Sequence, residues 1–227
     1  MNSCLKDFFN YLNNNCTYLI LRNWDDIFDE SIYGSCHEDI DILCESREHF
    51  IKLTGAKGIH HEKDRDNYVV SFGQNLVRFD VRWVGDGYYP TQMEERMLKN
   101  RILNNQCIYI PNLSDYYYSL SYHALLQKPL LSDEYLKKIN VIHSSFFDSD
   151  EDVSEEKIYA ELCSYLKSNG WAVEYPCDPG VYVNYERLKN ILVNKNTCRF
   201  LNRKLLLIKQ RILRYPQRLL YVLYKKE

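Results

Sequence analysis

Hydrophobic residues in the first part of the chain alternate between helical and strand spacing, and this pattern predicts an α+β fold. Apolar side chains recur every three to four positions over residues 5–12, as in a helix. A short β-branched and aromatic run at 17–21 and an apolar run at 39–44 read as strands. Residues 47–54 return to helical spacing and end at Gly55, a residue common after helices.

A hairpin is the clearest prediction for the next segment. Residues 68–72 and 77–83 alternate apolar and polar side chains, and the turn residues at 73–75 separate them. The two strands should therefore pair antiparallel, with the apolar side of the second strand facing the core. The opposite side of that strand carries three charged residues, Arg78, Asp80 and Arg82.

Helices should dominate the middle of the chain. A glycine-rich break at 85–90 precedes a predicted helix over 93–103. Ser114 should cap a longer helix that runs to about Gln127. Taken together, the elements predict a mixed sheet flanked by helices, followed by a helical C-terminal region.

An acidic stretch without periodicity at 148–156 reads as a linker and divides the chain. A further helix is predicted at 154–168. We therefore expect a core with its following helices at 1–147, a small α/β or helical appendage at 148–198, and a separate segment at 199–227.

The last segment is strongly basic. Residues 199–227 hold nine lysines or arginines and a single acid, and apolar residues such as Leu205 and Ile208 fall on one helical stripe. Pro216 should interrupt this helix. Such a helix can lie on an anionic membrane surface or dock its stripe on the protein's own core, and the sequence leaves both readings open.

Composition bears on location and partners. A formal net charge of -2 gives no overall field that would attract nucleic acid, so we expect no nucleic-acid partner. The eight cysteines lack metal-type spacing and should be free thiols in a reducing compartment. The chain shows neither an apolar signal segment nor a run long enough to span a bilayer, so we expect a cytoplasmic protein.

Two carboxylates on the strand at 39–44 indicate metal chemistry. The strand period of two places Asp39 and Asp41 on one face and the intervening apolar residues on the other. Ionised carboxylates this close repel one another, and a cation between them relieves the repulsion. Mg²⁺ or Mn²⁺ suits these hard oxygen ligands.

A third carboxylate would join them if the strand at 77–83 lies beside the strand at 39–44. Asp80 would then complete a three-carboxylate site, and Arg78 or Arg82 could neutralise phosphate oxygens. The alternative is that Asp80 forms an ion pair with one of these arginines on a solvated face.

Four segments in this order resemble the nucleotidyltransferase superfamily, within it a bacterial branch associated with surface-polysaccharide gene clusters. The resemblance covers residues 18–128. Its segments are Leu19-Ile20-Leu21-Arg22-Asn23, Asp39-Ile40-Asp41-Ile42-Leu43, Phe79-Asp80-Val81-Arg82-Trp83 and Tyr122-His123-Ala124-Leu125. It implies a metal-dependent enzyme that transfers a nucleotidyl group from a nucleoside triphosphate to a small acceptor, such as a sugar phosphate or polyol phosphate.

The resemblance also implies roles for individual residues. Asp39 and Asp41 would bind the metal, with Asp80 as third ligand or as base for the acceptor hydroxyl. Phosphate-binding positions would be Arg22, Asn23, Arg78, Arg82, His123 and Lys128. The superfamily usually has Gly followed by Gly or Ser after its first strand; here Arg22 and Asn23 occupy that place, and the Arg22 side chain would replace the missing loop amides.

Alternatives to this function and to some of these roles stay open. The chain could be a non-catalytic adaptor of the same fold, recruited to the membrane by its basic segment, or a transferase that modifies a partner protein. His123 could be a hydrogen-bonded histidine that packs its helix on the sheet, while His60, His61 and His143 are expected at the surface. The tyrosine run at 116–118 favours helix packing over a stacking surface for a ligand.

Overall fold

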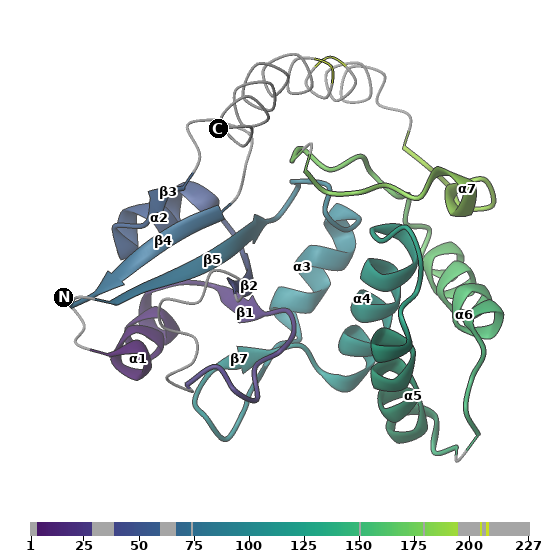
Figure 1. The fold of residues 1–227 in the computed structure, drawn as a ribbon, viewed down its shortest axis with the longest axis horizontal. Helices are drawn as coiled ribbons and strands as arrows, with labels where there is room; N and C mark the ends of the chain where they lie inside the picture. Colours follow the sequence, from purple (N-terminus) through teal and green to yellow (C-terminus); the bar gives the residue numbers. More distant parts are fainter. Residues whose placement is uncertain are drawn as a thin grey trace, which may run out of the picture.

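A five-stranded mixed sheet and a layer of helices make up the protein (Figure 1). The computed structural model describes residues 4–28, 39–59, 67–73, 75–149, 151–178, 180–194, 205 and 208. The elements in chain order are α1 (Leu5–Asn15), β1 (Tyr18–Ile20), β2 (Asp39–Cys44), α2 (Arg47–Thr54), β3 (Lys57–Gly58), β4 (Asn67–Phe72), β5 (Asn75–Trp83), α3 (Thr91–Lys99), β6 (Ile102–Leu103), β7 (Tyr109–Ile110), α4 (Leu113–Leu126), α5 (Asp133–Phe147), α6 (Glu155–Ser168) and α7 (Tyr185–Leu188).

The strand order of the sheet is β1-β2-β5-β4-β3, and the central pair β2 and β5 runs parallel while the other pairs are antiparallel. The predicted hairpin β4–β5 and the predicted mixed sheet flanked by helices are confirmed. In the parallel pair Asp41 lies opposite Asp80, and Ile40 lies opposite Phe79. Residues opposite one another on neighbouring strands face the same side of a sheet, so the three aspartates share one face.

The two faces of the sheet belong to different hydrophobic cores. Ile40 and Phe79 face a core that includes Phe8 of α1 and Phe50 of α2. Leu43, on the other face of β2, joins the larger core around α3 and α4. Each such buried side chain contributes about 1.5–3 kcal/mol of hydrophobic stabilisation. The aspartate face of the sheet is therefore the one that the helical layer partly covers.

Helix α4 lies at the centre of the helical layer and contacts both α5 and α6. Tyr118 of α4 stacks on Tyr165 of α6 with ring centroids 3.6 Å apart. The tyrosine run thus serves helix packing. The sequence pattern did not assign α5, and His143 on that helix is 2% exposed with its ring against Tyr117 and Phe147. The expectation that His143 lies at the surface is wrong, because α5 turns this side towards α4.

Several predicted boundaries shift in the structure. Helix α3 ends at Lys99, and the residues predicted as its last turn form β6, which pairs with β7. Helix α4 is capped by Asn112, whose side chain accepts a hydrogen bond from the Asp115 amide, and Ser114 lies inside the first turn. Gly55 ends α2 in the left-handed conformation as predicted, with φ of 67°.

Some predictions fall outside the described residues. They include His60, His61 and, apart from residues 205 and 208, the basic segment 199–227. The six cysteines that the structure describes are free thiols. None of the described helices combines the length and apolar character that crossing a membrane requires.

Candidate active site

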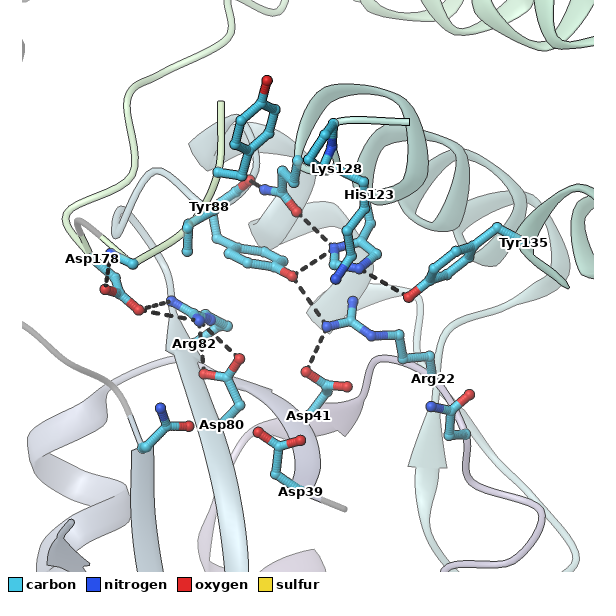
Figure 2. A pocket seen from close by; sticks show the side chains of 17 residues that line it. Arg22, Asp39, Asp41, Asp80, Arg82, Tyr88, His123, Lys128, Tyr135 and Asp178 are labelled. Carbon is cyan, nitrogen blue, oxygen red and sulfur yellow. Dashed lines mark hydrogen bonds and ion pairs between the residues drawn. The ribbon is translucent and has the colours of Figure 1, made fainter. Parts of the chain in front are cut away.

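A pocket of about 630 Å³ opens between the aspartate face of the sheet and helices α4 and α5 (Figure 2). Pockets of roughly 300–1,000 Å³ commonly hold small ligands. Eight of the nine site residues expected from the sequence line it, namely Arg22, Asn23, Asp39, Asp41, Asp80, Arg82, His123 and Lys128. Arg78 does not line the pocket; it lies opposite Asp39 in the sheet.

Three carboxylates from two strands form one side of the pocket. Asp39 and Asp41 come from β2, and Asp80 comes from its parallel neighbour β5. Burial raises the pKa of Asp41 to about 6; Arg22 opposes this shift, and the charges of Asp80 and Asp39 add to it. Burial, followed by the Asp80 charge, also raises the pKa of Asp39. The three groups therefore repel one another when ionised, as the sequence pattern indicated.

Two arginines neutralise part of this acidic cluster. The Arg22 Nη2 atom, just beyond β1, lies 2.5 Å from Asp41 Oδ1, and Arg82 Nη2 on β5 lies 2.8 Å from Asp80. Both guanidinium groups are almost fully buried. Asp80 thus does form an ion pair with a neighbouring arginine, but the pair lies in the pocket and not on a solvated face.

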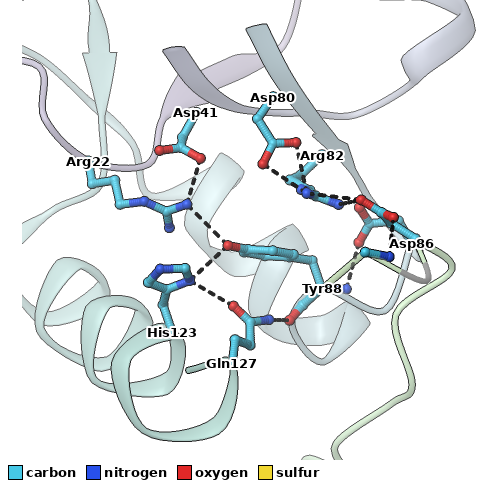
Figure 3. Close-up of polar contacts among 10 residues, drawn as sticks. Arg22, Asp41, Asp80, Arg82, Asp86, Tyr88, His123 and Gln127 are labelled. Atoms are coloured by element: carbon cyan, nitrogen blue, oxygen red, sulfur yellow. Dashed lines mark hydrogen bonds and ion pairs between the residues drawn. The ribbon is translucent and has the colours of Figure 1, made fainter. Parts of the chain in front are cut away.

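A hydrogen-bonded chain connects the acidic side of the pocket to helix α4 (Figure 3). The Tyr88 hydroxyl accepts a bond from Arg22 Nη2 at 3.1 Å and lies 2.8 Å from His123 Nδ1. Gln127 donates from Nε2 to the Tyr88 carbonyl, so its Oε1 is left to accept from His123 Nδ1 at 2.9 Å. This leaves His123 Nε2 as the acceptor for the Tyr135 hydroxyl at 3.1 Å.

His123 is therefore neutral and lies within hydrogen-bond distance of Tyr88, Gln127 and Tyr135. Burial, reinforced by the charge of Arg22, lowers the pKa of His123 well below 6.5. These contacts agree with the alternative expected for His123, a hydrogen-bonded histidine on a packed helix. The His123 ring also lines the pocket. Lys128 lines the same pocket as His123. Helix α4 ends at Leu126, so Lys128 lies beyond the helix and is not confined to the helical face that its spacing from His123 would give.

The turn between β5 and α3 places Tyr88 in the pocket. Asp86 Oδ1 accepts the Tyr88 amide at 2.7 Å. Glu94 of α3 accepts the amides of Gly85 and Tyr89 at 2.7 and 3.0 Å. The carboxyl groups of Asp86 and Glu94 are buried, and their hydrogen bonds to the backbone hold the turn in place. The Tyr88 ring lines the pocket.

Sequence reasoning missed six polar residues that line the pocket, namely Asn67, Tyr88, Gln127, Tyr135, Asp178 and Tyr182. Gln127 follows His123 by four positions, a helical spacing that could have indicated the pair. Asp178 comes from the segment after α6 and lies 3.4 Å from the Arg82 guanidinium. No local pattern could connect those two residues, because their contact depends on how distant segments pack.

The chemistry of the pocket suits a cation together with a phosphate group. Within the described parts of the chain, no three Asp, Glu, His or Cys side chains are arranged as a metal cage. Mg²⁺ is usually held by only one or two carboxylates plus substrate phosphates, and Asp39 and Asp41 supply donors of this kind. Arg22 and Arg82 supply forked donors that match phosphate oxygens.

Comparisons with known proteins give one partial structural likeness. No protein-family model matches the chain, and no curated protein gives a significant match. The solution structure of the antibiotic-resistance factor ANT(2'')-Ia aligns over 73% of this chain and 90% of its own, with 13% sequence identity and a TM-score of 0.39. A likeness at this level assigns no activity, so the function is argued from the pocket itself.

Proposed function

We propose that the protein is a metal-dependent nucleotidyltransferase that transfers a nucleotidyl group from a nucleoside triphosphate to a hydroxyl of a small acceptor and releases pyrophosphate. The observation that carries the proposal is the meeting of three carboxylates and two buried arginines in one pocket. Carboxylates kept close together in a pocket, with perturbed pKa values, are typical of functional sites.

Each side of the pocket has a distinct role in this proposal. Asp39 and Asp41 would hold Mg²⁺ or Mn²⁺, and Asp80, beside them on β5, would be the base that takes the acceptor's proton. When bound, the metal would lower the barrier by stabilising charge on the phosphorus oxygens. Arg22, Asn23, Arg82 and Lys128, which line the pocket, hold phosphate oxygens. Neutral His123 acts through Tyr88, which contacts Arg22.

The acceptor that we propose is a sugar phosphate or polyol phosphate of cell-surface glycan synthesis. The resemblance at residues 18–128 is the source of this class. A pocket of about 630 Å³ is consistent with a small acceptor, and a net charge of -2 does not favour a polynucleotide.

Titration calorimetry with Mg²⁺ and each nucleoside triphosphate tests the proposal. Wild type should bind one nucleotide, and Asp41→Asn should weaken that binding by at least about tenfold because a metal ligand is lost. Glu95→Gln removes one exposed carboxylate from α3 outside the pocket and is the matched control. Equal binding by wild type and Asp41→Asn would remove the basis of the proposal.

The basic segment supports a second proposal, in which residues 199–227 hold the protein at an anionic membrane surface in the cytoplasm. Two residues of its apolar stripe, Leu205 and Ile208, are exposed. A chain truncated after residue 198 should lose binding to vesicles that contain phosphatidylserine but keep nucleotide binding. If the full chain binds vesicles and neither form binds nucleotide, the protein is a membrane adaptor and not an enzyme.

A further inference from the structure

In this structure, the carboxylates proposed for cation binding form ion pairs with the arginines proposed for phosphate binding. Arg22 Nη2 is 2.5 Å from Asp41 Oδ1, and the two residues are each 8% exposed. Water cannot easily replace either partner in such a pair, so separating it leaves two poorly solvated charges. A ligand that takes only one partner must therefore leave the other charge uncompensated.

The second arginine is held in the same way, but from two sides. Arg82 lies 2.8 Å from Asp80 and 3.4 Å from Asp178, and its guanidinium stands 4.4 Å from the centre of the Tyr88 ring. Arg82 is 5% exposed. A phosphate that binds Arg82 alone would approach two carboxylates, and a cation that binds Asp80 alone would approach a buried guanidinium.

We propose that the cation and the phosphate group bind this pocket cooperatively, because each ligand releases the residues that the other needs. This inference rests on the proposed function and concerns how that site is loaded. With both ligands present, the carboxylates face the cation and the guanidinium groups face the phosphate. Asp41, Asp80 and the two arginines then each face an opposite charge, whereas either ligand alone leaves at least one of these four residues without one.

Coupling of this kind is reciprocal. If phosphate raises the affinity for the cation by some factor, the cation raises the affinity for phosphate by the same factor. Typical coupling factors between two ligands are about 5–150-fold. The free cation should therefore bind weakly, and the two ion pairs keep the acidic side of the pocket closed to metal until an anionic substrate arrives.

Manganese binding measured by electron paramagnetic resonance, which counts free Mn²⁺, tests the coupling without any turnover. Sulfate serves as the anion, and sodium chloride at matched ionic strength is its control. We expect sulfate to lower the wild-type Kd for Mn²⁺ about fivefold or more. Complexation of Mn²⁺ by sulfate in solution would raise the apparent Kd, so it cannot imitate the expected effect.

Substitution of an arginine identifies the ion pair as the cause. Arg22→Gln frees Asp41, so it should bind Mn²⁺ alone roughly tenfold more tightly than wild type and lose most of the response to sulfate. Lys137→Gln removes the same charge from the exposed side of α5, outside the pocket, while both ion pairs persist. It should change the affinity for Mn²⁺ alone by less than about threefold.

The wild-type comparison decides the matter even if Arg22→Gln fails to fold. Equal Kd values for Mn²⁺ with sulfate and with chloride would overturn the cooperative loading. So would an Arg22→Gln variant that folds and binds Mn²⁺ alone no better than Lys137→Gln. If either result appears while nucleotide binding still depends on Asp41, the proposed function survives and only the coupling is lost; if no nucleotide binds under any condition, both fall.

Discussion

At the scale of single residues, ionisation of the Asp41 carboxyl lowers the stability of the fold. Its pKa is raised to about 6 from the usual 3.8, so burial and the neighbouring carboxylates outweigh the nearby Arg22. The folded chain then holds the Asp41 proton more tightly than the unfolded chain does. The contribution of Asp41 to stability consequently falls as the pH rises from about 4 to above 6.

Asp41→Asn should therefore stabilise the protein at pH 8 while it weakens nucleotide binding. The asparagine oxygen can still accept the Arg22 hydrogen bond, and the buried negative charge is gone. We expect a melting temperature several degrees higher than that of wild type at pH 8. The difference should shrink towards pH 4, where the side chain at position 41 of the folded protein is neutral in both wild type and variant. Thermal unfolding followed by circular dichroism at the two pH values measures this. A variant less stable than wild type at pH 8 would show that the Arg22 ion pair dominates.

Tyr88 offers a second prediction at this scale. Tyr88→Phe removes the hydroxyl that accepts from Arg22 and contacts His123, while the ring still fills its place. We expect a stability loss of about 1 kcal/mol and a several-fold weaker affinity for triphosphate, because Arg22 loses one of its two fixed contacts. Tyr118→Phe, on a tyrosine that stacks in the helical layer, should leave the affinity unchanged. Calorimetry and thermal unfolding test both variants, and unchanged binding by Tyr88→Phe would place the hydroxyl outside the phosphate site.

At the scale of elements, the turn between β5 and α3 depends on glycine at two positions for different reasons. Gly85 and Gly87 have φ of +86° and +78°, a region that other residues rarely adopt. A Cβ atom at Gly85 would meet nothing within 4 Å, whereas one at Gly87 would lie 2.5 Å from the Tyr175 carbonyl oxygen. Only the second glycine is required by close packing as well as by conformation.

Gly87→Ala should consequently cost more stability than Gly85→Ala. Backbone strain alone costs about 1–2 kcal/mol for each. At Gly87 the contact with Tyr175 must also be relieved, which displaces the turn that carries Tyr88. Urea unfolding of the two variants gives the comparison, with Gly85→Ala as the matched control. Equal losses would mean that the segment around Tyr175 moves aside without cost.

Elements with a strict alternation could be predicted from the sequence, and those that depend on tertiary contacts could not. The alternation in β2 and β5 placed the apolar residues in the core and the aspartates on the opposite face, as found. The start of α4 was misplaced by two residues because Asn112, and not Ser114, presents its side chain to the first-turn amides. The two-residue strand β6 gains its identity only by pairing with β7, which no local pattern reveals.

At the scale of the whole molecule, the pocket forms between the aspartate face of the sheet and the helical layer, and this explains which site residues the sequence could indicate. Asp39, Asp41 and Asp80 share one sheet, so strand periodicity, together with the assumption that the strands at 39–44 and 77–83 are neighbours, is sufficient to predict that they meet. Asp178 reaches Arg82 across 96 positions of the chain. That contact follows from the packing of the segment after α6, which also contacts the β5–α3 turn through a bond from the Cys177 amide to the Asp86 carbonyl.

Glu94 of α3 and Asp86 of the β5–α3 turn form a buried pair of carboxyl groups. Burial raises the pKa of Glu94 well above 4.5, and the charge of Asp86 raises it further. The folded chain therefore keeps a proton on the pair at pH values where the unfolded chain has lost it. By this linkage the pair stabilises the fold most below pH 4.5, and the contribution declines as the pH rises towards the folded pKa.

Glu94→Gln removes this dependence and tests it. The amide keeps one acceptor for the turn but leaves the amide of Gly85 or Tyr89 without its bond, so the variant should be about 1 kcal/mol less stable than wild type near pH 4.5. From pH 4.5 to 8 the wild type should lose stability relative to the variant, and the difference in melting temperature should close or reverse. Glu95→Gln, the same change on the exposed neighbour, should follow the wild-type profile throughout. A constant difference between Glu94→Gln and wild type would mean that Glu94 ionises in the fold as it does in the unfolded chain, and the β5–α3 turn would then have to accommodate two buried charges beside Arg82.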